Sequence, residues 1–247
     1  MRIALLLAGV FMLSDASAKC EAVSGPQTAA LVELYTSQGC SSCPPADRWL
    51  STIGPRYGGS KVVPLSLHVD YWDYIGWKDP YAKREFSLRQ RKLSQLQRLA
   101  LVYTPQVMLQ GRDFRQWATP AFEREVERIN ARPAAARIRL AILGLKEGAI
   151  SVEANAELLD PSHARDATLF IAAYENKLSS QVTAGENRGE VLRHDYVVLE
   201  WLESPGMTAR RDLPLLPRAV PAHSGVAAFV QNRRSGEVLQ ALMQSAC

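Results

Sequence analysis

The feature that most constrains the fold of this chain is the motif Cys40-Ser-Ser-Cys43-Pro44-Pro45, which closely follows the apolar run 31–35. Two successive prolines suit the first turn of a helix, where backbone N–H groups have no acceptor within the helix. The sequence therefore predicts a strand, a short loop and a helix that begins at the cysteines. The positive end of that helix favours a thiolate, so we expect Cys40 to be a nucleophile and Cys43 a resolving thiol.

Two other uses of the pair remain open. Cys40 and Cys43 can form a fixed disulfide, or they can be half of a metal site. A structural zinc site needs four ligands, and the sequence has no second Cys-x-x-Cys motif to complete one. A Cys-x-x-Cys pair with a distant histidine also resembles the sites of exported copper chaperones of thioredoxin fold. A copper-handling protein with Cys40, Cys43 and His68 as ligands therefore stays as the metal alternative.

The N-terminal segment predicts export. Residues 1–18 combine an early arginine, an apolar run over residues 3–13 and an Ala-Ser-Ala end, which is typical of a cleaved signal peptide. No later segment has the roughly 20 uncharged apolar residues of a membrane-spanning helix. We expect a periplasmic or secreted protein in an oxidising compartment, where disulfides persist.

The first half of the chain, residues 19–133, alternates strand and helix patterns. Strands are expected at 31–36, 61–69, 106–110 and 111–116, and helices at 44–54, 81–100 and 119–129. Alternation of this kind implies a mostly parallel sheet. With the cysteine pair after the first strand, the order is that of a thioredoxin-like fold.

The second half, residues 134–247, predicts a different architecture. Strand patterns occur at 137–143, 149–156, 167–174, 196–201 and 226–231, without a long amphipathic helix between them. We expect a smaller β-rich domain built as a two-layer sandwich. The net charge of +4 is low, and the basic residues of the 81–100 helix alternate with acidic and apolar ones, which indicates a solvated face rather than a nucleic-acid site.

Four segments resemble a known family: residues 32–47, 68–80, 102–106 and 185–189. On these segments the chain is identified as a member of the secreted, thioredoxin-like domain-of-unknown-function family 1223. The resemblance covers most of the mature chain. It implies a thioredoxin-like fold and, as the family name says, no settled activity.

Comparison with thioredoxins suggests roles for two further sites. Glu33 interrupts the first strand seven residues before Cys40, close to the place of a buried acid that moves a proton for the resolving cysteine; the alternative is a strand residue that points to solvent. Pro105 begins the third strand, where we expect a cis Thr104–Pro105 bond and binding of an extended substrate by both residues. An ordinary trans proline is the alternative.

Other polar and aromatic residues are weaker candidates. Trp72 and Trp77 lie in a segment that leaves the carboxyl end of the second strand, where ligands bind in α/β sheets, so we expect them to contact substrate. Loop packing is the alternative for both. The segment 185–189 and His194 read as turn and strand residues, and we assign them no catalytic role.

The remaining two cysteines, Cys20 and Cys247, are expected to pair with each other by cysteine arithmetic. Free terminal thiols or bridges between molecules are the alternatives. The leading functional hypothesis is an exported thiol–disulfide oxidoreductase that acts on protein or small-molecule thiols, with an unidentified redox partner and with no cofactor. The alternatives are the copper-handling protein and a non-catalytic interaction module with a structural disulfide.

Overall fold

The computed structural model describes residues 20–146 and 148–247, which form a mixed α/β structure dominated by sheet. The expected signal peptide, residues 1–18, lies outside the described residues. The helices of the described residues are α1 (Pro44–Tyr57), α2 (Arg84–Leu96), α3 (Pro120–Asn130) and the short 3-10 helices η1 (Asp70–Ile75), η2 (Pro161–His163) and η3 (Pro221–His223). In this part of the chain no helix has the length and apolar character needed to cross a membrane.

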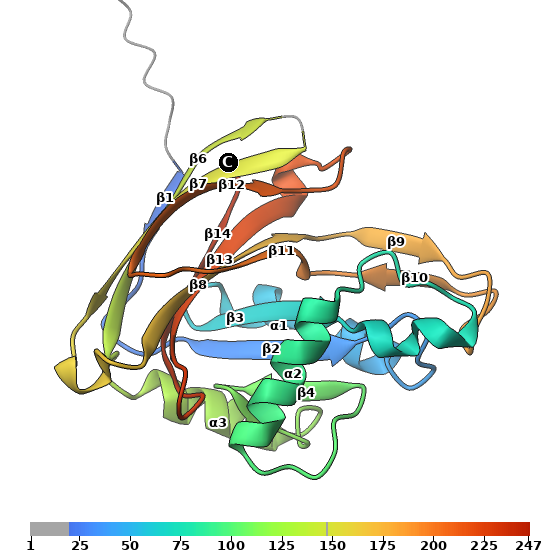
Figure 1. The fold of residues 1–247 in the computed structure, drawn as a ribbon, viewed down its shortest axis with the longest axis horizontal. Helices are drawn as coiled ribbons and strands as arrows, with labels where there is room; N and C mark the ends of the chain where they lie inside the picture. Colours follow the sequence, from blue (N-terminus) through green and yellow to red (C-terminus); the bar gives the residue numbers. More distant parts are fainter. Residues whose placement is uncertain (1–19, 147) are drawn as a thin grey trace, which may run out of the picture.

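The centre of the molecule is an eight-stranded sheet in the order β14-β13-β8-β11-β3-β2-β4-β5 (Figure 1). Its strands are β2 (Ala30–Thr36), β3 (Val62–His68), β4 (Gln106–Leu109), β5 (Arg112–Asp113), β8 (Ala167–Glu175), β11 (Val197–Glu203), β13 (Ser224–Asn232) and β14 (Val238–Ser245).

Strand β3 pairs in parallel with β2 and with β11, and the other neighbouring strands of this sheet are antiparallel. The expectation of a mostly parallel sheet is therefore wrong. Strand β4 begins at Gln106, opposite Tyr35 at the end of β2. Two strands joined by a helix are parallel only if the connection returns the chain to the end of the sheet where the first strand began. After α2, residues 97–105 instead carry the chain to the end where β3 finished, so β4 runs antiparallel to β2.

A second sheet has four antiparallel strands in the order β1-β6-β7-β12. They are β1 (Cys20–Val23), β6 (Ala136–Lys146), β7 (Ala149–Leu158) and β12 (Thr208–Pro214). Apolar side chains that alternate along β6 and β7 pack with those of β8, β11, β13 and β14 in one core. The two sheets thus form the layers of a sandwich, and the hairpin of β9 (Leu178–Gln181) and β10 (Val191–His194) extends from it (Figure 1).

The helices bury both faces of β2. Val32 and Leu34 share an apolar cluster with Leu50 of α1, whereas Leu31 lies in the cluster of Phe86 of α2 on the other face. Strands covered on both faces are apolar throughout, and every residue of β2 is buried.

Local capping signals set the starts of two helices. Pro44 and Pro45 occupy the first positions of α1, and the Thr119 hydroxyl accepts a hydrogen bond from the Ala121 N–H at the start of α3. The expected end of α1 near Gly54-Pro55 is too early, because the helix continues to Tyr57. Proline disfavours helical geometry in the preceding residue partly through that residue's Cβ, which glycine lacks.

The eight-stranded sheet draws strands from both sides of the expected boundary near residue 133. The Ser66 N–H of β3 donates to the carbonyl of Tyr196, the residue before β11, 2.8 Å away. Beneath this junction Leu65 of β3 shares an apolar cluster with Val198 of β11. The two halves of the chain therefore share a sheet and a core.

Candidate functional site

The Cys40–Cys43 disulfide lies at the N-terminus of α1. Cys43 is the residue that precedes the helix, and the Cys43 N–H donates to the Cys40 carbonyl at 3.2 Å. The two cysteines are 1% and 0% exposed, whereas Ser41 and Ser42 between them are exposed. The unpaired N–H groups of the first helical turn would stabilise a thiolate when the disulfide is reduced.

The second half of the chain holds the cysteine loop in place. In the 182–190 loop, which joins β9 to β10, the Asn187 side-chain amide donates to the carbonyls of Gln38 and Cys40 at 2.9 and 3.0 Å. Next to it, the Ser41 N–H donates to the Glu186 carboxylate at 2.9 Å. Hydrogen bonds from the backbone and side chain of Ser41 hold the pKa of Glu186 below its usual value. These two residues belong to a segment that sequence reasoning treated as a turn; its resemblance to a family segment was the one signal that could have pointed to them.

The expected substrate-contacting residues lie in one connected group. The Trp72 indole N–H donates to the Thr104 hydroxyl at 2.7 Å, and the Trp77 indole N–H donates to the Gln38 side-chain carbonyl at 3.1 Å. The Thr104–Pro105 peptide bond is cis, as expected. These hydrogen bonds join the 104–105 segment and the η1 region to residues that precede the cysteines.

Close packing ties η1 to the cysteine loop. A Cβ placed on Gly39 would lie 3.2 Å from both Trp72 Cβ and Ile75 Cδ1, and one placed on Gly185 would lie 3.0 Å from Ile75 Cδ1. Ile75 therefore fits between the loop that contains the cysteines and the 182–190 loop. Three segments that are far apart in the sequence converge at this point.

Glu33 is not brought to the cysteines. Its carboxylate accepts two hydrogen bonds from the Arg89 guanidinium of α2, at 2.6 and 3.1 Å. It lies on the face of β2 that α2 covers, whereas α1 covers the opposite face. Since neighbouring residues of a strand point to opposite faces, Val32 and Leu34 contact the α1 side and Glu33 does not.

A buried polar cluster lies behind the cysteine loop instead. His68 Nδ1 is 2.7 Å from Asp79 Oδ2, and both side chains are fully buried. Burial lowers the pKa of His68, but the Asp79 charge and hydrogen bond raise it, and the net direction is upward. The His68 ring also meets the His194 ring, with centroids 4.8 Å apart.

Asp47 connects this cluster to α1. Its Oδ2 accepts a hydrogen bond from the Thr36 hydroxyl at 3.2 Å and lies 3.8 Å from His194 Nδ1. A cavity of about 310 Å³ opens beside it between α1 and β10, lined by Pro44, Asp47, Arg48, Val191, Leu192, Arg193 and His194. Sequence reasoning missed both Asp47 and His194. Helical spacing could have pointed to Asp47, which is four residues after Cys43.

The three residues expected to hold copper are engaged in other contacts. Cys40 and Cys43 are joined to each other, and His68 Nδ1 is engaged with Asp79. Within residues 20–146 and 148–247, no group of three or more His, Cys, Asp or Glu side chains is arranged to hold a metal ion.

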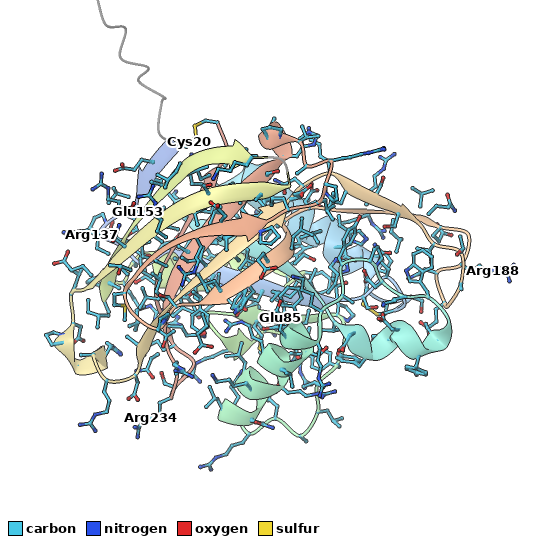
Figure 2. All side chains as sticks on the ribbon, turned by 45° about the horizontal axis from the view of Figure 1, so that its top comes forward. Cys20, Glu85, Arg137, Glu153, Arg188 and Arg234 are labelled. Carbon is cyan, nitrogen blue, oxygen red and sulfur yellow. A yellow bond between two sulfur atoms is a disulfide. The ribbon has the colours of Figure 1, made fainter. Side chains whose placement is uncertain are left out.

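Two other features lie away from the cysteine loop. The disulfide between Cys20 and Cys247 joins β1 to the segment after β14, which is the pairing expected from the cysteine count. Cys20 lies at the opposite side of the molecule from Arg188, which marks the tip of the 182–190 loop (Figure 2). A cavity of about 270 Å³ is formed by residues of β7, β11 and β12 and the turn at 204–205.

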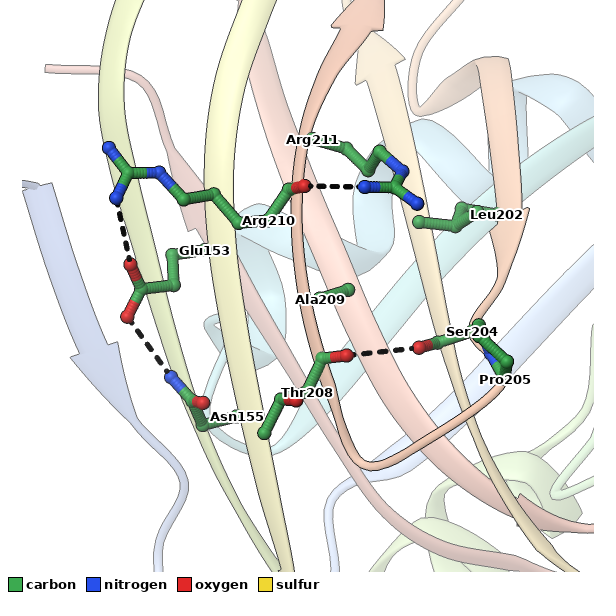
Figure 3. Close-up of a pocket in the computed structure, with 9 residues that line it drawn as sticks. All are labelled: Glu153, Asn155, Leu202, Ser204, Pro205, Thr208, Ala209, Arg210 and Arg211. Carbon is green, nitrogen blue, oxygen red and sulfur yellow. Dashed lines mark hydrogen bonds and ion pairs between the residues drawn. The ribbon is translucent and has the colours of Figure 1, made fainter.

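The polar groups of that second cavity largely satisfy one another (Figure 3). Glu153 lies 3.9 Å from the Arg210 guanidinium and accepts a hydrogen bond from Asn155, while the Ser204 hydroxyl donates to the Thr208 carbonyl. No cysteine lines it. We therefore take the cysteine loop and its surroundings as the candidate site.

Comparisons with known proteins give a family and a fold. The chain is similar to the X-ray crystal structure of a protein from Agrobacterium tumefaciens, a structural-genomics target, with 25% identity, a TM-score of 0.60, and coverage of 90% of this chain and 96% of that one. It is also similar in fold to HBP35 of Porphyromonas gingivalis, with 15% identity, a TM-score of 0.63, and coverage of 90% and 76%. No curated protein matches the chain.

The match to a protein family extends over most of the chain. Residues 31–231 match the family described as "Protein of unknown function (DUF1223)". The matched region contains the cysteine loop, η1 and the 182–190 loop, which are the segments that converge at the candidate site. The chain belongs to the DUF1223 family.

Proposed function

We propose that this protein is an exported thiol–disulfide oxidoreductase with a thioredoxin-like core. The observation that carries the proposal is the Cys40–Cys43 disulfide at the first turn of α1. A dithiol in this position can form and break a small ring, and the helix N-terminus stabilises the thiolate that attacks. Cys40 would attack a substrate disulfide, and Cys43 would then displace the substrate.

The arrangement of the first half supports the thioredoxin-like core. The strand order β3-β2-β4-β5, with α1 and α3 on one face of β2 and α2 on the other, brings the cysteines to the carboxyl end of β2. In α/β sheets this end carries ligand and catalytic sites. Trp72 and Thr104 border it, and we propose that they contact the substrate.

The two disulfides are compatible with an oxidising compartment outside the cytoplasm. We propose protein or small-molecule thiols and disulfides as substrates. The two electrons of each exchange are carried by the cysteine sulfurs as they change between dithiol and disulfide, so we propose that the reaction needs no further cofactor.

A structural disulfide in a non-catalytic module is the second candidate, and burial favours it. Both cysteines are at least 99% buried, and Asn187 and Glu186 hold their loop by three hydrogen bonds. Under this alternative the disulfide would stabilise the loop and would not exchange with external thiols.

Reduction of insulin by dithiothreitol separates the two candidates. We expect the wild-type protein to accelerate the precipitation of reduced insulin chains, and Cys40→Ser to abolish the acceleration because the attacking thiol is lost. Cys43→Ser would trap a mixed disulfide that mass spectrometry detects. A wild-type protein no faster than Cys40→Ser would reject the oxidoreductase and leave the structural disulfide. The reduction potential of the pair then gives the direction, with about −270 mV expected for a reductase and about −120 mV for an oxidant.

A further inference from the structure

The position of Asp47 on α1 relates it directly to Cys43. Cys43 already has helical backbone angles, with φ −78° and ψ −38°, and the Asp47 N–H donates to its carbonyl at 3.1 Å. Residues four apart in a helix lie on one face, with Cβ atoms about 5–6 Å apart. Asp47 is 5% exposed and Cys43 is 0% exposed. The side chains of Cys43 and Asp47 thus leave the same face of α1, and both are buried.

The hydrogen bonds of Gln38 define which nitrogen of His194 carries a proton. The Gln38 side-chain carbonyl accepts from the Trp77 indole, so its amide nitrogen is the group that faces Ser180 Oγ at 2.9 Å and His194 Nε2 at 3.2 Å. His194 Nε2 therefore accepts, and in the neutral ring the proton is on Nδ1. That nitrogen lies 3.8 Å from Asp47 Oδ2, beyond hydrogen-bond distance, and it has no other hydrogen-bond partner among the described residues.

One oxygen of the Asp47 carboxylate is a buried hydrogen-bond acceptor without a donor among the described residues. Oδ2 has Thr36 and His194 beside it, whereas Oδ1 is buried and has no hydrogen-bond partner among the described residues. A buried acceptor without a partner is costly, and such atoms in folded proteins call for an explanation. A thiol hydrogen on the same helix face would provide the missing donor when the disulfide is reduced.

We propose that the Asp47 carboxylate accepts the proton of the Cys43 thiol in the resolving step, and that His194 is the positioning residue that orients this carboxylate. This inference rests on the proposed thiol–disulfide exchange. It assigns to Asp47 the role that sequence reasoning gave to Glu33, which is paired with Arg89 on the other face of β2.

The resolving step moves one proton and exchanges one disulfide bond for another. In a mixed disulfide between Cys40 and a substrate, the Cys43 proton passes to Asp47, and the Cys43 thiolate attacks the Cys40 sulfur. The Cys40–Cys43 bond forms, the bond to the substrate breaks, and the substrate leaves as a thiolate. The protein dithiol is oxidised by two electrons and the substrate disulfide is reduced. The proton leaves Asp47 through the cavity between α1 and β10, which Asp47 lines.

Other charged and titratable groups lie near Asp47 and His194 and would contribute to a pH profile of the second step. They are His68 and Asp79 behind His194, Tyr81 against both histidine rings, and Arg48 and Arg193 at the cavity. Asp47 is the carboxylate among them that shares a helix face with Cys43, so its removal has an effect that the others do not mimic.

The test uses dithiobis(nitrobenzoic acid), which releases one coloured aryl thiolate at each step. Attack by Cys40 gives the first phase, and attack by Cys43 on the mixed disulfide gives the second. The Cys40→Ser/Cys43→Ser double variant measures any background from the other cysteines. In the wild type we expect a second phase whose rate changes little between about pH 6 and pH 8, because Asp47 accepts the thiol proton within the site.

In Asp47→Asn we expect an unchanged first phase and a second phase at least about tenfold slower at neutral pH. Its rate should rise roughly tenfold per pH unit while the Cys43 thiol is mostly protonated, because deprotonation must then precede attack without a neighbouring acceptor. In His194→Gln the second phase should slow but stay independent of pH, since Asp47 remains. Glu33→Gln is the matched control, a buried carboxylate neutralised on the other face of β2, and it should leave both phases unchanged.

The outcomes separate this inference from the function on which it rests. A wild-type protein that releases no more thiolate than the double cysteine variant rejects the oxidoreductase itself. Two phases in the wild type with a pH-independent second phase in Asp47→Asn overturn the role of Asp47 alone. If circular dichroism shows that Asp47→Asn is unfolded, Asp47→Ser replaces it, because its hydroxyl retains a partner for Thr36 and cannot take a proton at neutral pH. A second phase slowed by Glu33→Gln and not by the Asp47 variants also overturns the proposal.

Discussion

Neutralising Glu33 should destabilise the protein without impairing exchange. The carboxylate is 0% exposed and Arg89 is 9% exposed, and two hydrogen bonds join them. In Glu33→Gln the guanidinium stays buried and loses its counter-ion. Breaking a buried pair in this way typically costs about 3–5 kcal/mol, because an uncompensated charge remains in the interior.

The surroundings of Arg89 place the expected loss near the lower end of that range. The guanidinium keeps a hydrogen bond to Gln231 at 3.0 Å. It also lies over three aromatic rings, each of which contributes about 0.5–2 kcal/mol of attraction to a cation. These rings are Phe170, Trp201 and Phe229, with centroids 5.1, 4.5 and 5.2 Å from the guanidinium carbon. We therefore expect a loss of about 3 kcal/mol in the free energy of unfolding.

Denaturant unfolding with both disulfides intact measures the loss, and thermal unfolding should show a fall of about 6–12 °C. The matched comparison is Glu33→Leu/Arg89→Met, in which both charges are replaced by apolar groups. Its loss should be smaller than that of Glu33→Gln, since no buried charge remains. A loss below about 1 kcal/mol in Glu33→Gln, or a double variant that is less stable than the single one, would refute the reasoning.

Three further predictions follow from other contacts. Replacing both Cys20 and Cys247 by serine opens a cross-link with a sequence separation of 227 and should lower the free energy of unfolding by up to about 5 kcal/mol, measured with denaturant under non-reducing conditions. Asn187→Ala loses two hydrogen bonds to the cysteine loop, about 2 kcal/mol, so alkylation of the reduced motif should accelerate by up to roughly thirtyfold in a mass-spectrometric assay. The pKa of Asp79 is lowered, because burial, which raises it, is outweighed by His68, and the pKa of His68 is raised. The Asp79 contribution is present above about pH 4 and is lost as pH falls through its lowered value, whereas that of His68 is present below about pH 6.5 and is lost as pH rises through its raised value. Asp79→Asn should therefore lower the free energy of unfolding most between the lowered pKa of Asp79 and the raised pKa of His68. Equal losses at pH 5 and pH 9 in unfolding curves would contradict a charged His68–Asp79 pair.

Local signals were sufficient for most elements that carry the cysteines. The prolines after Cys43 and the Thr119 cap act within one helical turn, and the structure has α1 and α3 at those places. Short strands were harder to recognise. The strand β1, residues 20–23, and the hairpin strands β9 and β10 each have four residues, too few for a periodic pattern. The pairing partner of β1 is also distant in the sequence, because Cys20 lies opposite Ile142 of β6.

The site shows the same limit. The sequence placed Cys40 and Cys43 correctly at the start of a helix, because the signal and its consequence are adjacent. It did not reveal that Arg89 would neutralise Glu33, since strand alternation assigns a residue to a face but does not say which helix covers that face. The hydrogen bonds of Asn187 to the loop span 147 residues or more and depend on the complete sheet, so no local pattern encodes them.

The junction between β3 and β11 also covers an edge of the sheet that the first half of the chain would otherwise expose. All seven residues of β3 are buried, and β11 pairs with β3 at Ser66, on the side that faces away from β2. If residues 134–247 were removed, β3 would become an exposed edge strand that is largely apolar, a template on which other chains can add strands. Pro64 removes one N–H donor from that edge, but the Ser66 N–H that now donates to Tyr196 would be free to pair with another molecule. The C-terminal half thus protects the β3 edge of the sheet from pairing with other chains. A fragment that ends at residue 133 should therefore aggregate through β3.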